Sequence, residues 1–198
     1  MRIPILSTAF FALVLTMAGC NRSGDNQMST ETNLAEDAAT NDALGTNAMV
    51  AEPAALPTDA ASFANAVAAS DMFEIESAKL AADKATTPAI KAFAAQLVTD
   101  HQKSTVELKA AAAKATPPLT VIPVLDAEQQ GLIDQLKGAN GDDFERRFVD
   151  QQSNAHQKAL ALLQNYAAKG DSAPLKDFAS KAVTVVQGHL DHVNSIRK

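Results

Sequence analysis

The sequence predicts an all-α protein, a four-helix bundle with a short extra helix in the crossover between the second and third long helices. Three observations lead to this prediction. Apolar residues recur at helical spacing over four long segments, no region alternates with period two over a useful length, and helix-start and helix-stop residues separate the segments. A simple helical array of the same segments is the alternative.

The first two long helices are expected on either side of "TTP". The first runs from near Phe63 to near Ala85. Thr87 is a candidate cap for the second helix, and Pro88 suits its first turn. That helix is expected to continue to about Ala115, because the three prolines of "TPPLTVIP" exclude a continuous helix beyond it.

A short helix is expected within the long connection that follows, over "DAEQQGLIDQLKG". Asp126 and Gln129 stand at capping-box spacing, and Gly138 is a candidate stop. The segment is too short to be one of the four main helices.

The last two long helices follow after this short one. Asp142 and Glu145 repeat the capping-box spacing and open a third long helix that is expected to reach about Lys169. "GDSAP" then makes a tight turn, and the fourth helix fills the chain from Pro174 to near Arg197. A short turn, a long crossover and another short turn are the connections of a ferritin-like bundle.

The beginning of the chain has the pattern of an export signal. Arg2 supplies a positive start, Ile3–Met17 is almost wholly apolar, and "LTMAGC" resembles a bacterial lipobox in which Cys20 becomes the lipidated first residue. We therefore expect residues 1–19 to be a lipoprotein signal peptide. Cleavage after Ala18, giving a protein secreted to the periplasm, is the alternative.

The residues after the cysteine predict where the protein is attached. Asn21 stands where an aspartate would resemble an inner-membrane retention signal, so we expect a lipid anchor in the outer membrane that faces the periplasm. Residues 20–60 are then a flexible acidic tether, because positions 21–60 hold seven acidic residues against Arg22 and no aromatic residue. A coil of that length reaches on the order of 35 Å.

Charge and aromatic content exclude some partners of the domain, residues 61–198. Its 16 acidic and 15 basic residues are interspersed, so no basic stripe supports nucleic-acid binding. The chain has no Trp and one Tyr, which makes a surface of aromatic anchors or base stacking a poor expectation. The sequence does not identify a protein partner.

Each long helix places a polar side chain on or at the margin of its apolar face. Residues set at 100° intervals put Glu74 in the first stripe, His101 in the second and His189 in the fourth, with His156 at the margin of the third. Burying such groups without partners costs several kcal/mol, so they should meet one another, a metal or ordered water. The candidate supporting residues around them are Glu76, Asp100, Gln152 and His192.

Two interpretations of the inward groups stay open. In one, all four converge on a metal ion, and imidazole with carboxylate suits iron, zinc or copper. In the other, which we favour, they form a hydrogen-bonded polar layer, because a lone inward histidine is more often structural. His189 also lies further from the turn at Gly170 than His156 does, an offset of about 6 Å at about 1.5 Å per residue. A di-iron centre is disfavoured, because no Glu stands three residues before any histidine.

Four short stretches of the domain carry a recognisable order of polar residues. "SDMFEIESAKL" and "VTDHQKS" hold a Glu-Ile-Glu pair and an Asp-His, and "SNAHQKA" and "VQGHLDHV" hold the three later histidines. Over roughly residues 63–195 this order resembles the family known as domain of unknown function 4142. The matching positions are Glu74, Glu76, Asp100, His101, His156 and His189. The resemblance implies an exported, ferritin-like bacterial protein and supplies no reaction.

Two functions follow as hypotheses. The chain is either an envelope protein that binds a metal or small ligand through its inward groups, or a structural or interaction module of the envelope whose buried His/Glu layer only supports the fold. An enzyme is a distant third. The sequence has no nucleophile-and-base motif, no phosphate-binding glycine loop, and no cysteine besides Cys20.

Overall fold

A computed structural model describes residues 55–197, so the predicted signal peptide, Cys20 and nearly all of the predicted tether lie outside the described residues. The described part contains five helices and no strand. They are α1 (Ala60–Lys84), α2 (Pro88–Ala112), α3 (Ala127–Gly138), α4 (Gly141–Lys169) and α5 (Ala173–Ile196). None of them is long and apolar enough to cross a membrane.

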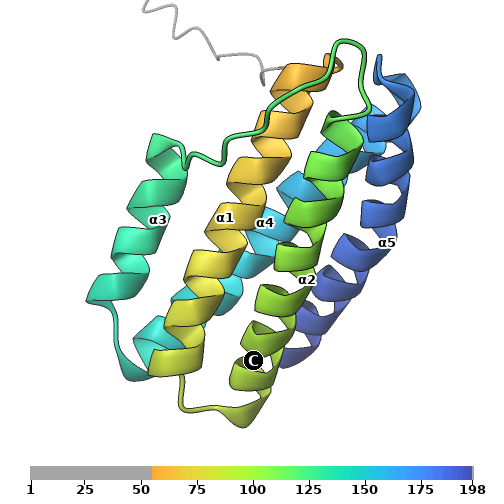
Figure 1. Cartoon of the computed structure of the whole chain (residues 1–198). Coiled ribbons are helices and arrows are strands. Elements are labelled where there is room, and N and C mark those ends of the chain that lie inside the picture. The colour runs from red at the N-terminus through yellow and green to blue at the C-terminus, as the bar shows by residue number, and fades with distance from the viewer. Residues whose placement is uncertain (1–54, 198) are drawn as a thin grey trace, which may run out of the picture. The chain divides into compact units, whose positions relative to one another are not determined.

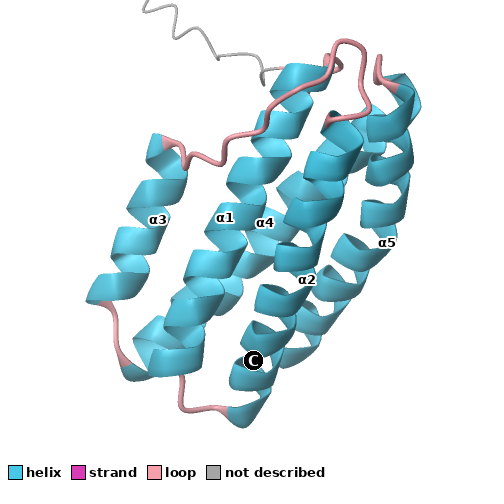
Figure 2. Cartoon of the chain, in the orientation of Figure 1, coloured by secondary structure: helices cyan, strands magenta, loops and turns pink. Residues whose placement is uncertain are grey.

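The four long helices form a bundle whose neighbours are set by the two short turns (Figure 1). Helix α1 packs against α2 and α4, and α5 packs against α4 and α2. Helices α2 and α4 run in the same direction, because the crossover returns along the bundle through α3 (Figures 1 and 2). The predicted all-α bundle with a short extra helix in the crossover is confirmed.

The helix ends show which of the predicted capping and stop residues are correct. The capping box of α3 is formed as predicted: Asp126 Oδ1 accepts from the backbone N–H of Gln129 at 2.8 Å, and Gln129 Oε1 accepts from the N–H of Asp126 at 3.1 Å. Helix α4 ends before Gly170, as expected. A Cβ atom there would lie 2.5 Å from the ring of Tyr166, so this turn has no room for a side chain.

One predicted cap is wrong, and another is formed without its side chain. The N-cap residue of α4 is Asn140 and not Asp142. Thr87 is the N-cap residue of α2, as predicted, but its side chain makes no capping hydrogen bond. The Glu145 carboxylate instead accepts bonds from the backbone N–H groups of Thr86 and Thr87, at 2.6 and 2.8 Å, and from both hydroxyls. Partial burial raises the pKa of Glu145, but these hydrogen bonds outweigh it and lower the pKa to about 2. Glu145 thereby ties the α1–α2 turn to α4.

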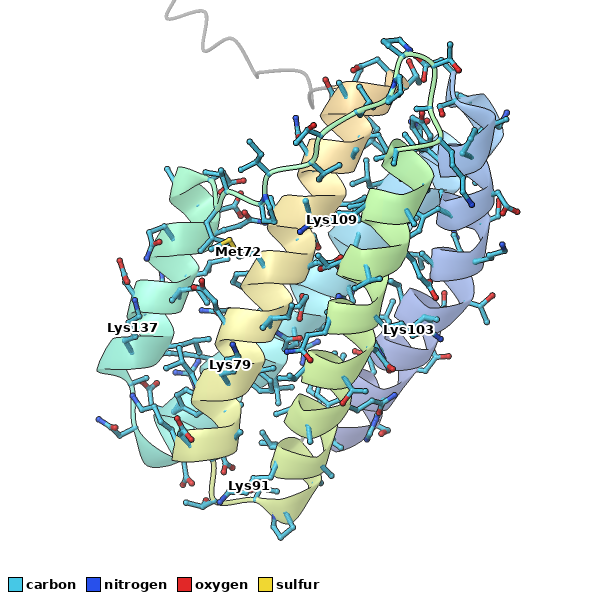
Figure 3. The ribbon with its side chains drawn as sticks, in the orientation of Figure 1. Met72, Lys79, Lys91, Lys103, Lys109 and Lys137 are labelled. Atoms are coloured by element: carbon cyan, nitrogen blue, oxygen red, sulfur yellow. The ribbon has the colours of Figure 1, made fainter. Side chains whose placement is uncertain are left out.

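The apolar core is divided into two clusters at opposite ends of the bundle. The first cluster surrounds Phe63 and Tyr166, whose rings stack with centroids 3.7 Å apart. The second cluster surrounds Phe93 and Phe148, whose ring centroids are 6.4 Å apart. The labelled lysines of α1, α2 and α3 lie on the outside of the bundle (Figure 3).

Buried polar residues separate these two clusters. On α2, His101 lies between Leu97 of the second cluster and Leu108 of the first. On α5, His189 lies between Val186 of the first cluster and Val193 of the second. The same order holds on α1 and α4, so the four long helices together place one polar level across the middle of the core.

Candidate metal centre

We call this level the polar layer. Its members are Asp71, Glu74, Ser77, His101, Gln152, His156 and His189. All are at most 7% exposed. Every long helix contributes at least one of them, so the positions follow from the helical spacing of inward residues.

Three histidine rings meet in the polar layer. The ring centroids of His156 and His189 are 5.3 Å apart, those of His101 and His189 are 5.4 Å apart, and those of His101 and His156 are 5.9 Å apart. One ring nitrogen from each histidine lies within 4.8 Å of the other two. We refer to these three residues as the histidine triad.

Each ring of the triad is oriented by one hydrogen bond of 2.8 Å. His101 Nδ1 lies against Asp71 Oδ1, His156 Nδ1 against the backbone carbonyl of Gln152, and His189 Nε2 against Asp100 Oδ2. These partners are acceptors, so the proton of a neutral ring sits on the nitrogen that faces them. The other nitrogen of each neutral ring then carries a lone pair.

Those remaining nitrogens are His101 Nε2, His156 Nε2 and His189 Nδ1. All three are buried and have no hydrogen-bond partner among the described residues. Leaving a buried polar atom without a partner costs roughly 1–3 kcal/mol, so three of them in one place indicate a site for something that accepts lone pairs.

Glu74 lies beside the triad and not within it. Its Oε1 atom is 3.8 Å from His156 Nδ1, and its Oε2 atom has no partner among the described residues. Burial raises the pKa of Glu74 to about 7, although the charge of His101 and a hydrogen bond from Gln152 act in the opposite direction. The structure thus brings the four predicted ligands to one level, but only the three histidines share the 4.8 Å separation.

The pKa values of the three rings shift in different directions, because burial acts on each ring together with a different hydrogen-bond partner. It lowers the pKa of His156 to about 3, against the opposing hydrogen bond to Gln152, and it lowers the pKa of His189. Burial also acts to lower the pKa of His101, but the hydrogen bond to Asp71 and the charge of Glu74 outweigh it, so the pKa is raised overall. His101 is therefore the ring that holds a proton most readily.

The predicted supporting residues divide into two groups. Asp100 contacts His189, and Gln152 holds His156 with its carbonyl while its Nε2 donates to Ser77 Oγ at 2.9 Å. His192 lies outside the triad, with its Nδ1 3.1 Å from Gln96 Oε1 and its ring against Phe93. Glu76 is half-buried and makes no hydrogen bond to the layer.

Sequence reasoning missed Asp71, whose carboxylate orients His101. Asp71 is 3% exposed, and Thr105 Oγ1 donates to its second oxygen at 3.1 Å. The signal was available, because Asp71, Glu74 and Ser77 stand three residues apart on one face of α1.

The chain belongs to the family described as Domain of unknown function (DUF4142), whose model matches residues 45–196. No curated protein matches it. Among solved structures, CopM in the Cu(II)-bound form superposes with a TM-score of 0.59 at 17% identity, covering 70% of this chain and 95% of CopM. CopM in the Cu(I)-bound form gives 0.57 at 19% identity, covering 69% and 94%, and the Ag-bound form gives 0.57 at 19%, covering 69% and 93%. At these identities the likeness shows the fold alone.

Proposed function

We propose that this member of the DUF4142 family binds one metal ion per chain between His101 Nε2, His156 Nε2 and His189 Nδ1, with copper as the first candidate. Two observations carry the proposal together: each of the three buried histidines keeps a ring nitrogen without a partner among the described residues, and one ring nitrogen of each histidine lies within 4.8 Å of the other two. Each opposite nitrogen already has an acceptor, which is how ligating histidines are oriented in proteins.

The geometry supports a single ion after a small contraction. Metal–imidazole bonds are about 2.0–2.1 Å long, so nitrogens that share one ion lie roughly 3.3–3.6 Å apart. One ring nitrogen of each histidine lies within 4.8 Å of the other two, so a set of three such atoms needs to close by at most about 1.5 Å. Rotation of the rings about their side-chain torsions is enough for such a movement, and the rings of a buried cluster gain the metal bonds in return.

The donor set supports copper over the other candidates. Three neutral imidazoles suit copper and zinc, and at a given nitrogen site Cu²⁺ binds more tightly than Zn²⁺ or Fe²⁺. A di-iron centre needs several carboxylate ligands, but Asp71 and Asp100 are bonded to the outer nitrogens of His101 and His189, which leaves Glu74 as the one remaining carboxylate beside the triad among the described residues. The structures of similar fold include the Cu(I)-, Cu(II)- and Ag-bound forms of CopM, which adds support for a copper-type ion.

A purely structural polar layer is the competing account. It explains the hydrogen bonds that Asp71, Asp100 and Gln152 make to the rings. It gives no role to the second nitrogen of each ring, which in such a layer would be expected to face a donor. The same observation therefore favours the metal site.

Elemental analysis by mass spectrometry tests the proposal. The full chain is purified without an affinity histidine tag or chelator, beside the double variant His101→Ala/His189→Ala and the control His192→Ala. We expect about one ion per chain in the parent and in the control, after loading with Cu(I), and less than a tenth of that in the double variant. If the parent protein stays folded and takes up no copper, zinc or iron, the proposed metal site is wrong and the polar layer has a structural role only.

We also propose that the protein acts in the bacterial envelope, held to the outer membrane by lipid on Cys20. The apolar run and "LTMAGC" support this address. Mass spectrometry of the N-terminal peptide should show a diacylglyceryl group on Cys20, and Cys20→Ala should move the protein from the membrane to the soluble fraction. An unmodified chain cleaved after Ala18 would instead indicate a secreted protein.

A further inference from the structure

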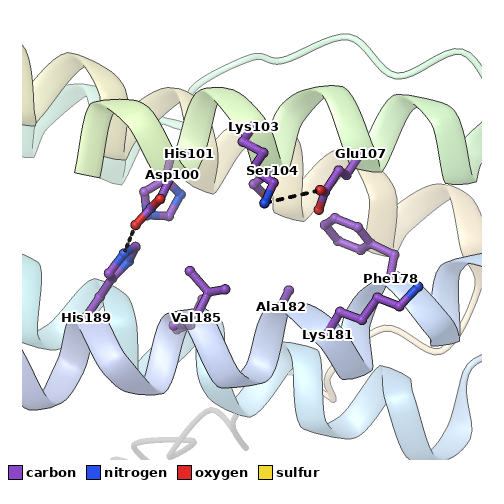
Figure 4. Close-up of a pocket in the computed structure, with 11 residues that line it drawn as sticks. Asp100, His101, Lys103, Ser104, Glu107, Phe178, Lys181, Ala182, Val185 and His189 are labelled. Carbon is purple, nitrogen blue, oxygen red and sulfur yellow. Dashed lines mark hydrogen bonds and ion pairs between the residues drawn. The ribbon is translucent and has the colours of Figure 1, made fainter. Parts of the chain in front are cut away.

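A pocket of about 260 Å³ opens between α2 and α5 and reaches the histidine triad (Figure 4). Asp100, His101 and Lys103 line it from α2, and Phe178, Val185 and His189 line it from α5. Two of the three triad histidines are therefore part of its wall. His156 and Glu74 are not, so the pocket approaches the triad from one side only.

The triad by itself leaves a metal ion short of ligands. Sites with three protein ligands usually take a water or another exogenous ligand in the remaining position. Glu74 is poorly placed for that position. Its Oε1 atom lies 3.8 Å from His156 Nδ1, the nitrogen that donates to Gln152, and Glu74 is not among the residues whose ligand atoms lie within 4.8 Å of one another.

The walls of the pocket restrict what can enter it. Phe178, Ala182, Val185 and Val186 give it an apolar side. The charged groups at its mouth are balanced: Lys103 lies 3.8 Å from Glu107, and Lys181 lies 2.7 Å from Asp177, which is outside the pocket. The Asp100 carboxylate is committed to His189. A volume of about 260 Å³ is below the range of about 300 to 1,000 Å³ that is usual for ligand pockets.

We infer that the pocket between α2 and α5 admits a small monodentate ligand, with one donor atom and few other heavy atoms, to the open coordination position of an ion held by the histidine triad. This inference rests on the proposed metal site and deepens it. The site would then be an open one, able to exchange a ligand or hand over its ion through the pocket, and not a closed structural site.

Azide binding to the Cu(II)-loaded full chain tests this. Azide is a small donor whose bond to Cu(II) gives a charge-transfer absorption band and changes the electron paramagnetic resonance spectrum. We expect a saturable change with one azide per copper in the parent. Elemental analysis after the titration should show the copper still bound.

Two exposed valines provide a matched pair of variants. Val185 is 48% exposed and lines the pocket, whereas Val106 is 68% exposed and does not. Val185→Phe should weaken azide binding at least tenfold at unchanged copper content, and Val106→Phe should leave it unchanged. Ala182→Leu, which narrows the same pocket, is the second blocking variant should Val185→Phe fold poorly.

The outcomes separate this inference from the proposed function. A parent that binds one copper per chain but shows no azide band, or equal azide binding in the Val185→Phe and Val106→Phe proteins, would overturn the open pocket and leave the metal site standing. A parent that binds no copper would overturn both.

Discussion

The polar layer and the two apolar clusters are built by the same four helices, but their buried atoms are satisfied in different ways. In the clusters, packing is sufficient, as in the stacked rings of Phe63 and Tyr166. In the polar layer, Glu74 and all three triad histidines keep a buried polar atom without a partner among the described residues. Since unpartnered polar atoms cost free energy, we expect the clusters to account for stability, and the role that we propose for the layer is to bind an ion.

The largest expected effect is on stability and comes from an apolar cluster. Phe63→Ala removes a fully buried ring from the first cluster and should lower the free energy of unfolding by about 3–5 kcal/mol. Urea unfolding measures this loss, and elemental analysis of the folded fraction should show unchanged metal content. A change in the free energy of unfolding below about 1 kcal/mol, or loss of the metal from folded protein, would contradict the assignment of stability to the clusters and of metal binding to the layer.

The next largest effect is a pH-dependent change in the free energy of unfolding, which comes from Glu74 in the polar layer. The folded pKa of Glu74, about 7, is raised above its ordinary value of 4.5. Protonation of the buried carboxyl therefore favours folding below pH 4.5, and this contribution is lost as the pH rises through about 7. In metal-free protein, Glu74→Gln should gain stability relative to the parent between pH 5 and pH 8, by at most about 3 kcal/mol.

Urea unfolding of both metal-free proteins at several pH values measures that difference. A stability difference between Glu74→Gln and the parent that stays constant from pH 5 to pH 8 would mean that the carboxyl is not desolvated in the folded state.

A smaller effect concerns the orientation of the triad. Asp71 holds His101 through a bond of 2.8 Å, so Asp71→Asn should weaken metal binding about 10- to 100-fold without unfolding the protein. Competition with a coloured chelator measures the affinity. The matched control is Asp177→Asn, an exposed residue of α5 that pairs with Lys181. Equal metal affinities in the two variants would show that Asp71 does not support metal binding.

The smallest effect is expected at the surface. Lys158 and Glu128 form an exposed ion pair between α4 and α3, with Nζ and Oε1 2.6 Å apart. Lys158→Ala should change the free energy of unfolding by less than about 1 kcal/mol and leave the metal content unchanged. A thermal melt of the metal-free protein measures the change. A larger loss would show that the contacts of α3 contribute to the polar layer.

The sequence predicted the inward histidines because their positions follow from helical periodicity alone. His101 and His189 stand within apolar stripes whose neighbours, Leu97 and Val193, are indeed buried. The bounds of α3, and the turn at Gly170, also followed from local signals. Such features depend only on residues close in sequence.

Contacts between helices could not be predicted in the same way. Glu145 has the spacing of a local capping residue, but the α1–α2 turn, 58 residues earlier in the chain, takes its carboxylate. The inward position of Asp71 follows from its helical spacing to Glu74 and Ser77, but its bond to His101 depends on how α1 and α2 pack.

The separation of His156 and His189 along the bundle is smaller than the expected offset of about 6 Å because their side chains lean in opposite directions. Side chains lean toward the N-terminus of their own helix. His156 on α4 therefore leans away from the turn at Gly170, and His189 on α5 leans toward it. These opposite tilts offset much of the expected separation, so the two ring centroids are only 5.3 Å apart.

Anomalous diffraction from crystals of the copper-loaded chain tests the central claim most directly, because it locates the ion without reference to activity. We predict one strong copper peak per chain in the polar layer, about 2.1 Å from His101 Nε2, His156 Nε2 and His189 Nδ1. A peak elsewhere on the protein, with the triad rings unmoved and unliganded, would contradict the account and leave the three histidines as part of the core.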